Sequence, residues 1–221
     1  LMNLSIPSTQ PFQSNTLKTN VSATGAKLHN RSDKRAEEHN KILGSARKEP
    51  GWAVWVTGLP ASGKSTVTKA LKEKLQGLGV ESQILESETL RRVLAPKPEL
   101  SPEERETFYS SMVYIGVLLT NNGVNVIFDA TAYKRRWRRA ARGLIDKFIE
   151  VYIRCPLEVC RERDSKGTYK TTETGETVYA PGAQEEYEET WDPALVLDCV
   201  TDSPDAAAGK IIEVMRQNDF I

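Results

Sequence analysis

Residues 58–65 have types and spacing that suit phosphate chemistry. They read GLPASGKS and fit the phosphate-loop (P-loop) pattern G-x-x-x-x-G-K-[ST] without a mismatch. The glycines let the backbone turn so that several N–H groups point into one hollow, which also faces the positive end of the following helix. Lys64 adds a positive charge for the β- and γ-phosphates, and Ser65 offers a hydroxyl to Mg²⁺. The loop therefore predicts that the chain binds a nucleoside triphosphate, ATP, together with Mg²⁺.

The segments on both sides of this loop have the character that the motif needs. Residues 52–57 form an apolar run typical of a strand, and residues 66–75 place apolar side chains at helical spacing. A glycine-rich turn before an ordinary helix is the alternative, but a strand–loop–helix context favours phosphate binding. The residues expected to contact the nucleotide are Gly58, Ala61, Ser62, Gly63, Lys64, Ser65 and Thr66.

Three carboxylates follow predicted strands and are candidates for catalysis. Glu86 and Glu88 come after the second strand, and Asp129 ends the third. Because ligands bind at the carboxyl ends of parallel strands, we expect these side chains beside the P-loop. We expect Asp129 to bind Mg²⁺ with Ser65, and Glu88 or Asp129 to orient an acceptor hydroxyl. The alternatives stay open: the glutamates are also typical helix caps, and the aspartate is a common turn residue.

Basic side chains gather in three places. Arg91, Arg92 and Arg105 lie before or at the start of the helix that we expect over the acceptor. Residues 134–147 form a very basic helix, mostly a solvated face, from which one or two side chains would reach phosphates. Residues 164–191 form a long polar segment that we interpret as a mobile lid that excludes water. The third basic group flanks this lid and consists of Arg161, Arg163, Lys166 and Lys170.

Alternating strand and helix patterns predict an α/β fold: a parallel five-stranded sheet flanked by helices in three layers, with a mobile lid. The expected strands are residues 52–57, 80–85, 124–128, 149–153 and 195–197. The expected helices are residues 66–75, 102–121, 134–147, 156–163 and 204–217. Trp137 and Trp191 are expected to be packing residues rather than platforms on which a base stacks.

The chain divides into two unequal parts. Residues 1–50 are polar and predict a partly disordered arm, with a short helix near residues 34–43. An organelle transit peptide is an alternative for this arm, although it holds little arginine. Residues 51–221 form the expected kinase domain.

Composition excludes some classes of protein. With 30 basic and 30 acidic side chains the formal net charge is zero, which argues against a nucleic-acid-coating protein. No apolar run approaches the ~20 residues of a membrane span. Cys155, Cys160 and Cys199 lack metal-ligand spacing and are expected to be buried free thiols in a reducing, cytoplasmic compartment.

The P-loop and several later segments resemble the adenylylsulfate (APS) kinase family of P-loop kinases. The similarity covers about residues 51–215, and its order and spacing hold throughout. The matching segments are GLPASGKST at 58–66, then Pro156-Leu157-Glu158-Val159-Cys160, Arg163-Asp164, Lys166-Gly167, Tyr169-Lys170, Gly175-Glu176, Gly182, Tyr187-Glu188, Pro193 and Leu195-Val196-Leu197-Asp198.

The resemblance implies an alcohol phosphotransferase of sulfate assimilation, which moves the γ-phosphate of ATP to the 3′-hydroxyl of adenylylsulfate. It implies nucleotide binding by Arg163 and a catalytic or acceptor role for the lid lysine Lys170. It also implies acceptor binding by Arg91 and Arg105, and a possible homodimer.

The chain departs from the family pattern mainly in the acceptor half. Glu86-Ser87-Glu88 stands where the family has D-G-D, and Phe108 stands for an asparagine at the acceptor. Leu100 replaces a phenylalanine before the next helix, and Ala180 replaces the lid phenylalanine that stacks on the acceptor adenine. Asp129 opens a D-A-T sequence that is similar to another group of P-loop kinases. A kinase for another small, anionic or nucleotide-like acceptor therefore stays open, as does a non-catalytic nucleotide-binding partner.

Overall fold

The computed structural model describes residues 49–96, 101–173, 181–183 and 185–221. The predicted arm at residues 1–50, with its short helix, lies outside the described residues apart from its last two. Leu100, Ala180 and part of the predicted lid lie outside them as well.

Five parallel strands form one sheet in the order β2-β3-β1-β4-β5. The central strand β1 is buried at all six positions, as expected for a parallel sheet that is covered on both faces. The strand bounds are β1 Ala53–Gly58, β2 Gln83–Glu86, β3 Val126–Asp129, β4 Phe148–Arg154 and β5 Leu195–Asp198.

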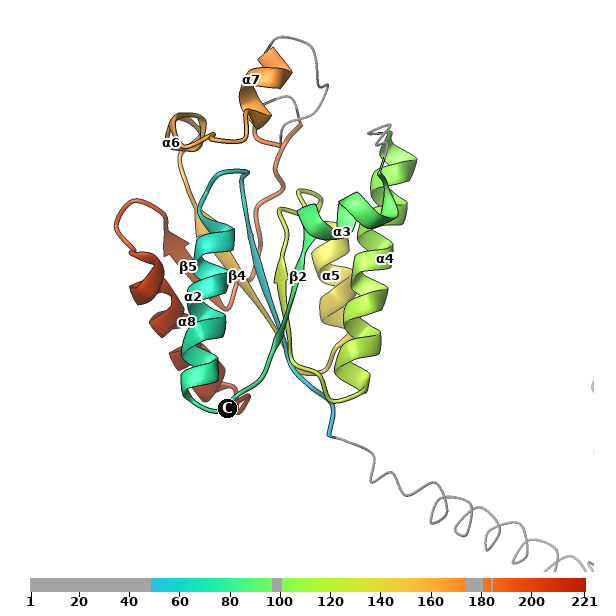
Figure 1. Cartoon of the computed structure of the whole chain (residues 1–221), viewed down its shortest axis with the longest axis vertical. Helices are drawn as coiled ribbons and strands as arrows, with labels where there is room; N and C mark the ends of the chain where they lie inside the picture. The colour runs from blue at the N-terminus through green and yellow to red at the C-terminus, as the bar shows by residue number, and fades with distance from the viewer. Residues whose placement is uncertain (1–48, 97–100, 174–180, 184) are drawn as a thin grey trace, which may run out of the picture. The chain divides into compact units, whose positions relative to one another are not determined.

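Helices cover both faces of this sheet, as Figure 1 shows. On one face, α2 (Lys64–Gly77) packs against α8 (Pro204–Gln217) and against apolar side chains of β1, β3 and β4. On the other face, α4 (Pro102–Asn121) and α5 (Arg135–Leu144) cover a core that contains Trp55, Phe128 and Trp137. This arrangement confirms the predicted three-layer fold.

Three shorter helices lie at the carboxyl end of the strands. Helix α3 (Ser87–Leu94) follows β2 directly, so Glu86 and Glu88 sit at its first turn. Helix α6 (Leu157–Glu162) follows β4, and α7 (Thr168–Glu173) lies within the segment expected to be a lid. Neither α3 nor α7 was expected from the sequence.

Aromatic and basic side chains on and around α5 occupy both buried and exposed positions. Trp137 is buried as expected, but Trp191 is 72% exposed and packs under Arg135, whose guanidinium carbon lies 4.0 Å from the ring centroid. Arg138 belongs to the basic helix, most of whose basic side chains were expected to be solvated, and it is fully buried.

Candidate active site

The P-loop connects β1 to α2 through unusual backbone angles. Gly58 has φ 148°, and a Cβ there would lie 2.6 Å from the carbonyl oxygen of Ile153. Gly63, with φ 97°, is the N-cap of α2, and Ala61 also has a positive φ of 59°. L-residues other than glycine seldom adopt such angles. The loop geometry therefore explains why the motif needs glycine at both of its ends.

Lys64 lies at the first turn of α2 and is only 9% exposed. Its Nζ donates a hydrogen bond of 2.8 Å to the carbonyl oxygen of Leu59. Burial lowers the pKa of this ammonium to about 8, although the nearby Asp129 carboxylate opposes the shift. A buried ammonium of this kind is stabilised by an incoming anion, which makes Lys64 a suitable phosphate ligand.

Asp129 and Glu86 end neighbouring strands and are paired in the register of β2 and β3. Asp129 is 4% exposed and accepts a hydrogen bond of 3.3 Å from Thr68 Oγ1. Burial raises the pKa of the Asp129 carboxyl, whereas the charge of Lys64 and the hydroxyls of Ser65 and Thr68 act in the opposite direction. The sheet thus brings two carboxylates to the P-loop, as the strand ends predicted.

A cavity of about 590 Å³ opens where these groups meet. This volume falls within the range typical of small-molecule sites. Ten residues predicted for the site line it: Ala61, Ser62, Gly63, Lys64, Ser65, Thr66, Glu86, Glu88, Asp129 and Arg163. Gly58 acts instead through the backbone turn at the base of the loop.

Lys166 also lines the cavity and was not selected as a site residue from the sequence. It forms an ion pair with Glu88, and Glu88 binds Arg92 at 2.9 Å as well. The Lys166 hydrogen bond is the main reason that the pKa of Glu88 is lowered. The sequence signal for Lys166 is the motif Lys166-Gly167. Lys170, for which the resemblance implies a catalytic or acceptor role, is exposed and is not among the described residues that line the cavity.

Three residues expected at the acceptor form a separate cluster between α3 and α4. The guanidinium carbon of Arg91 lies 4.0 Å from the ring centroid of Phe108, which is 3% exposed. Arg105 is also buried; its Nη1 donates to the hydroxyl of Tyr133 at 3.3 Å and pairs with Glu185 at 3.4 Å. Among the described residues that line the cavity, Arg91, Arg105 and Phe108 are absent.

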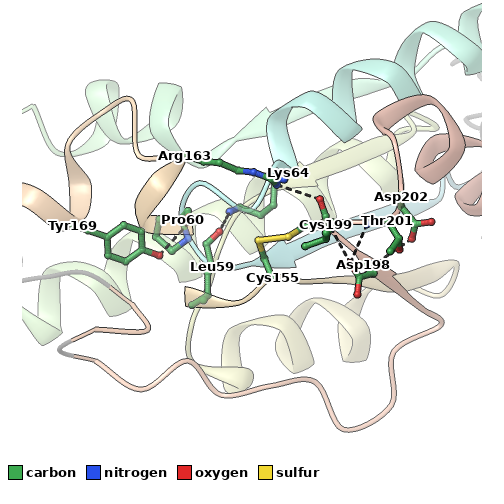
Figure 2. The surroundings of a disulfide bond; sticks show 11 residues. Leu59, Pro60, Lys64, Cys155, Arg163, Tyr169, Asp198, Cys199, Thr201 and Asp202 are labelled. Atoms are coloured by element: carbon green, nitrogen blue, oxygen red, sulfur yellow. Dashed lines mark hydrogen bonds between the residues drawn. A yellow bond between two sulfur atoms is a disulfide. The ribbon is translucent and has the colours of Figure 1, made fainter. Parts of the chain in front are cut away.

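A disulfide lies beside the cavity, as Figure 2 shows. Cys155, after β4, is bonded to Cys199, after β5, with their Cα atoms 5.2 Å apart. Cys160 is free and buried. The prediction of three free thiols is therefore wrong for two of them. Strands β4 and β5 are parallel neighbours, so the residues that follow their carboxyl ends, Cys155 and Cys199, lie side by side. The inference of a reducing compartment loses its support from these cysteines.

The disulfide lies next to groups that border the cavity. Cys199 lines the cavity, and its carbonyl oxygen accepts a hydrogen bond of 3.2 Å from Arg163 Nη1 (Figure 2). On the opposite side of the P-loop, the hydroxyl of Tyr169 in α7 donates to the carbonyl oxygen of Pro60 at 3.1 Å. The start of the predicted lid is therefore bonded to the segment after β5 through Arg163 and to the P-loop through Tyr169.

The side chains near Lys64 are suited to Mg²⁺. Over residues 49–96, 101–173, 181–183 and 185–221, no three His, Cys, Asp or Glu side chains gather as a metal cage. Mg²⁺ does not need one, because it keeps several waters and takes one or two protein oxygens besides the phosphates. The buried carboxylate of Asp129 next to the hydroxyl of Ser65 provides such oxygens.

None of the helices in the described part of the chain has the length and apolar character to cross a membrane.

Comparisons with known proteins point to one family. A family model for adenylylsulphate kinase matches residues 50–198. An adenylyl-sulfate kinase from Rippkaea orientalis is 37% identical over 155 residues, which cover 70% of this chain and 84% of that protein. A probable adenylyl-sulfate kinase from Archaeoglobus fulgidus is 39% identical over 147 residues, covering 66% of this chain and 95% of that protein.

Solved structures agree with these matches. The Mycobacterium tuberculosis APS kinase CysC in complex with AMPPNP and APS is similar, with a TM-score of 0.71 and 29% identity, over 76% of this chain and 98% of that one. A gluconokinase from Sinorhizobium meliloti is 19% identical, with a TM-score of 0.50, and the alignment covers 78% of this chain and 96% of the gluconokinase. This similarity shows the fold alone.

Proposed function

Because the chain belongs to the adenylylsulphate kinase family and is a phosphotransferase that acts on a hydroxyl, we propose that it transfers the γ-phosphate of ATP to the 3′-hydroxyl of adenylylsulfate. The product would be 3′-phosphoadenylylsulfate. The observation that carries the proposal is a single cavity in which the P-loop, Lys64 and the carboxylates Glu88 and Asp129 face the same space.

Lys64 and the P-loop amides bind the β- and γ-phosphates in this proposal. The ammonium exchanges its bond to the Leu59 carbonyl for phosphate oxygens and stabilises the charge that develops during in-line transfer. Ser65 and Asp129 would hold Mg²⁺, which would neutralise phosphate charge when it is bound. Asp129 is fixed for this task by its burial and by the hydroxyl of Thr68.

Glu88 and Lys166 act on the acceptor side of the same cavity. Glu88 orients the acceptor hydroxyl and accepts its proton once the hydroxyl replaces Lys166 at the carboxylate. Lys166, released from this ion pair, adds positive charge near the transferred phosphate, which is the role expected for Lys170. Asp129 stays the alternative proton acceptor, since it lines the cavity as well.

Arg163 and the lid complete the nucleotide site. Arg163 lines the cavity from the side of Cys199, where the nucleotide base would lie. Closure of the segment after α6 would exclude water, so that phosphate passes to the acceptor.

A second candidate is a kinase for another small acceptor. The observation that favours it is the position of Arg91, which stacks on Phe108 and pairs with Glu104 at 3.8 Å instead of lining the cavity. An arginine held in this way is not available to an acceptor nucleotide unless α3 moves.

A homodimer and a cytoplasmic location stay predictions. The first depends on the family alone. Free thiols no longer support the cytoplasmic location, because Cys155 and Cys199 form a disulfide.

The test is an acceptor panel with purified protein, ATP and Mg²⁺. ADP formation is measured with adenylylsulfate, with nucleosides and with phospho-alcohols. Turnover that is fastest with adenylylsulfate supports the main proposal, and a preference for a phospho-alcohol supports the second candidate. ADP formation with none of them, alongside measurable ATP binding, would favour a non-catalytic nucleotide-binding partner.

A further inference from the structure

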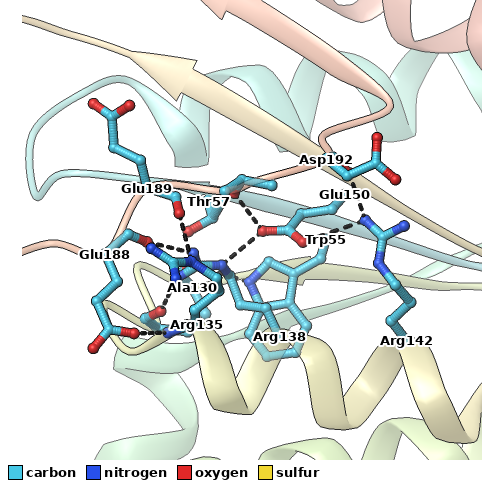
Figure 3. A network of polar contacts seen from close by, with 12 residues as sticks. Trp55, Thr57, Ala130, Arg135, Arg138, Arg142, Glu150, Glu188, Glu189 and Asp192 are labelled. Carbon is cyan, nitrogen blue, oxygen red and sulfur yellow. Dashed lines mark hydrogen bonds and ion pairs between the residues drawn. The ribbon is translucent and has the colours of Figure 1, made fainter.

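Arg138 is a buried arginine that is not among the described residues lining the cavity. It lies on α5, and its side chain is fully buried together with that of Glu150 on β4, which is 3% exposed. Arg138 Nε donates to Glu150 Oε1 at 2.7 Å. Figure 3 shows this pair at the centre of a network of polar contacts.

The guanidinium of Arg138 also binds two segments that are far apart in sequence. One is residues 130–134, which follow β3 and are called here the acceptor-side loop; Arg138 Nη1 donates to the carbonyl oxygen of Ala132. The other is residues 185–190, called here the return segment; Nη2 donates to the carbonyl oxygen of Glu188 (Figure 3). A guanidinium can serve three acceptors at once because its donors form a rigid planar fork.

Further hydrogen bonds join the same two segments. The Glu188 amide donates to the carbonyl oxygen of Tyr133 at 2.9 Å, and the Arg135 amide donates to Glu188 Oε2 at 2.8 Å. Thr190 Oγ1 donates to Glu150 Oε1 at 2.6 Å, so the anchor of Arg138 also binds the return segment. The two segments therefore form one unit with Arg138 beneath it.

This unit borders the cavity on the side where the acceptor is proposed to bind. The acceptor-side loop starts directly after Asp129, and it contains Thr131, which lines the cavity too. Thr57 Oγ1 donates to the Thr131 carbonyl at 2.6 Å and lies 2.9 Å from the Tyr187 hydroxyl. The nucleotide side is held by other contacts, such as that of Arg163 with the Cys199 carbonyl.

Stability alone is a weak explanation for a charged pair in this position. Removing two charges from water costs about as much as their attraction returns, and an apolar pair of similar volume is often as stable or more so. What the pair supplies, and an apolar pair cannot, is a fixed direction for three hydrogen bonds.

We propose that Arg138 is a positioning residue for phosphoryl transfer: anchored by Glu150, it fixes the acceptor-side loop and the return segment so that Asp129 and Thr131 face the P-loop correctly. The proposal rests on the proposed phosphotransfer at this cavity. It assigns Arg138 no contact with either substrate. Its effect should therefore appear in the rate of transfer and not in the binding of ATP.

The test compares Arg138→Lys with Arg142→Lys as the matched control. Arg142 lies on the same helix and also contacts Glu150, at 3.5 Å, but its side chain is 38% exposed and its other bond is to the Asp192 carbonyl. A lysine at 138 keeps the charge, but its three donors sit on one nitrogen and cannot reproduce the planar fork that reaches Glu150, Ala132 and Glu188. We expect kcat to fall about 100-fold, the scale of a misplacement of about 1 Å, with the Kd of ATP unchanged. The control should keep the wild-type kcat.

Amide hydrogen exchange gives a readout that does not depend on the acceptor. In Arg138→Lys, exchange should accelerate in residues 130–134 and 185–190 but not in the P-loop. If Arg138→Lys does not fold, Glu150→Gln is tested in its place, because glutamine keeps an acceptor oxygen for Arg138. The kcat of Glu150→Gln should also be lower than that of the wild type, with unchanged ATP affinity.

Two results would overturn the proposal. One is a folded Arg138→Lys variant with wild-type kcat and a lower melting temperature, which would leave only a structural role. The other is loss of ATP affinity in step with kcat. If wild-type protein does not phosphorylate adenylylsulfate, the proposed acceptor fails, and exchange in the two segments still tests whether Arg138 fixes them.

Discussion

Replacing Asp129 by asparagine should separate catalysis from stability. The substitution keeps the shape of the side chain and an oxygen that can accept the hydrogen bond from Thr68, which lies at 3.3 Å. It removes the negative charge beside Lys64 and Ser65. We expect kcat to fall at least as much as in Glu88→Gln, with ATP binding largely retained.

The expected size of the catalytic loss follows from the position of the charge. Removal of one fixed electrostatic group at a reacting centre typically costs about 10²–10³ in kcat, or about 2.7–4 kcal/mol. Asp129 would exert its effect through the Mg²⁺ that it holds or by accepting the proton of the acceptor. Asp129 is 4% exposed, so bulk water does little to replace the lost charge. Glu88 has a side chain that is 43% exposed, which allows more replacement by water.

The stability should change in the opposite direction. Burial raises the pKa of Asp129 in the folded protein, so folding disfavours the charged form above the pKa of the unfolded chain. At pH 7 the charge of Asp129 therefore lowers the free energy of unfolding. This destabilisation is absent at a pH low enough to protonate the carboxyl in both the folded and the unfolded protein. Asparagine removes the cost, so the melting temperature without nucleotide and Mg²⁺ should stay the same or rise.

Steady-state kinetics, ATP titration and thermal unfolding in EDTA measure these effects on both variants. If Asp129→Asn keeps nearly the wild-type kcat while Glu88→Gln is inactive, the reasoning on catalysis is refuted. Glu86 and Glu88 would then take the catalytic role of the two aspartates of the family's D-G-D motif. A clear fall in the melting temperature of Asp129→Asn would refute the reasoning on the buried charge.

Three further predictions can be checked with the same assays. Lys64→Ala should lower the rate of phosphoryl transfer by orders of magnitude, because it removes the charge at the β- and γ-phosphates; near wild-type ADP formation would contradict the P-loop assignment. Reducing the Cys155–Cys199 bond, which joins residues separated by 44 positions, should lower the free energy of unfolding by about 4 kcal/mol on chain entropy; the doubly substituted Cys155→Ala/Cys199→Ala protein should not respond to dithiothreitol in urea unfolding. Deleting residues 1–48 should leave kcat and the melting temperature unchanged, since this polar segment has too few apolar residues to belong to the core; a collapse of either quantity would show that it is integrated.

The order of strands and helices was accessible from the sequence because local signals define it. The helix predicted at residues 204–217 has those bounds, since Ser203 caps it and Pro204 suits its first position. The helix predicted to start at Pro102 is capped by Ser101 in the same way. Helix α3 was missed because its eight residues follow β2 without a separating turn.

The sequence by itself determined the chemistry of phosphate binding and the family. A P-loop needs only consecutive residues, so its pattern and its backbone angles are local properties. The placement of Asp129 beside it was also predictable, because strand ends in a parallel sheet meet at one edge. These inferences did not require any knowledge of which side chains pair.

Tertiary structure alone decided the pairings between distant residues. Lys166 meets Glu88, Cys155 meets Cys199, and Arg91 stacks on Phe108 only because the chain path brings them together. Arg138 is the clearest case: a basic helix predicts a solvated face, since arginines are seldom fully buried unless they are paired. Its partner Glu150 lies on β4, and the burial of both is set by the packing of α5 on the sheet.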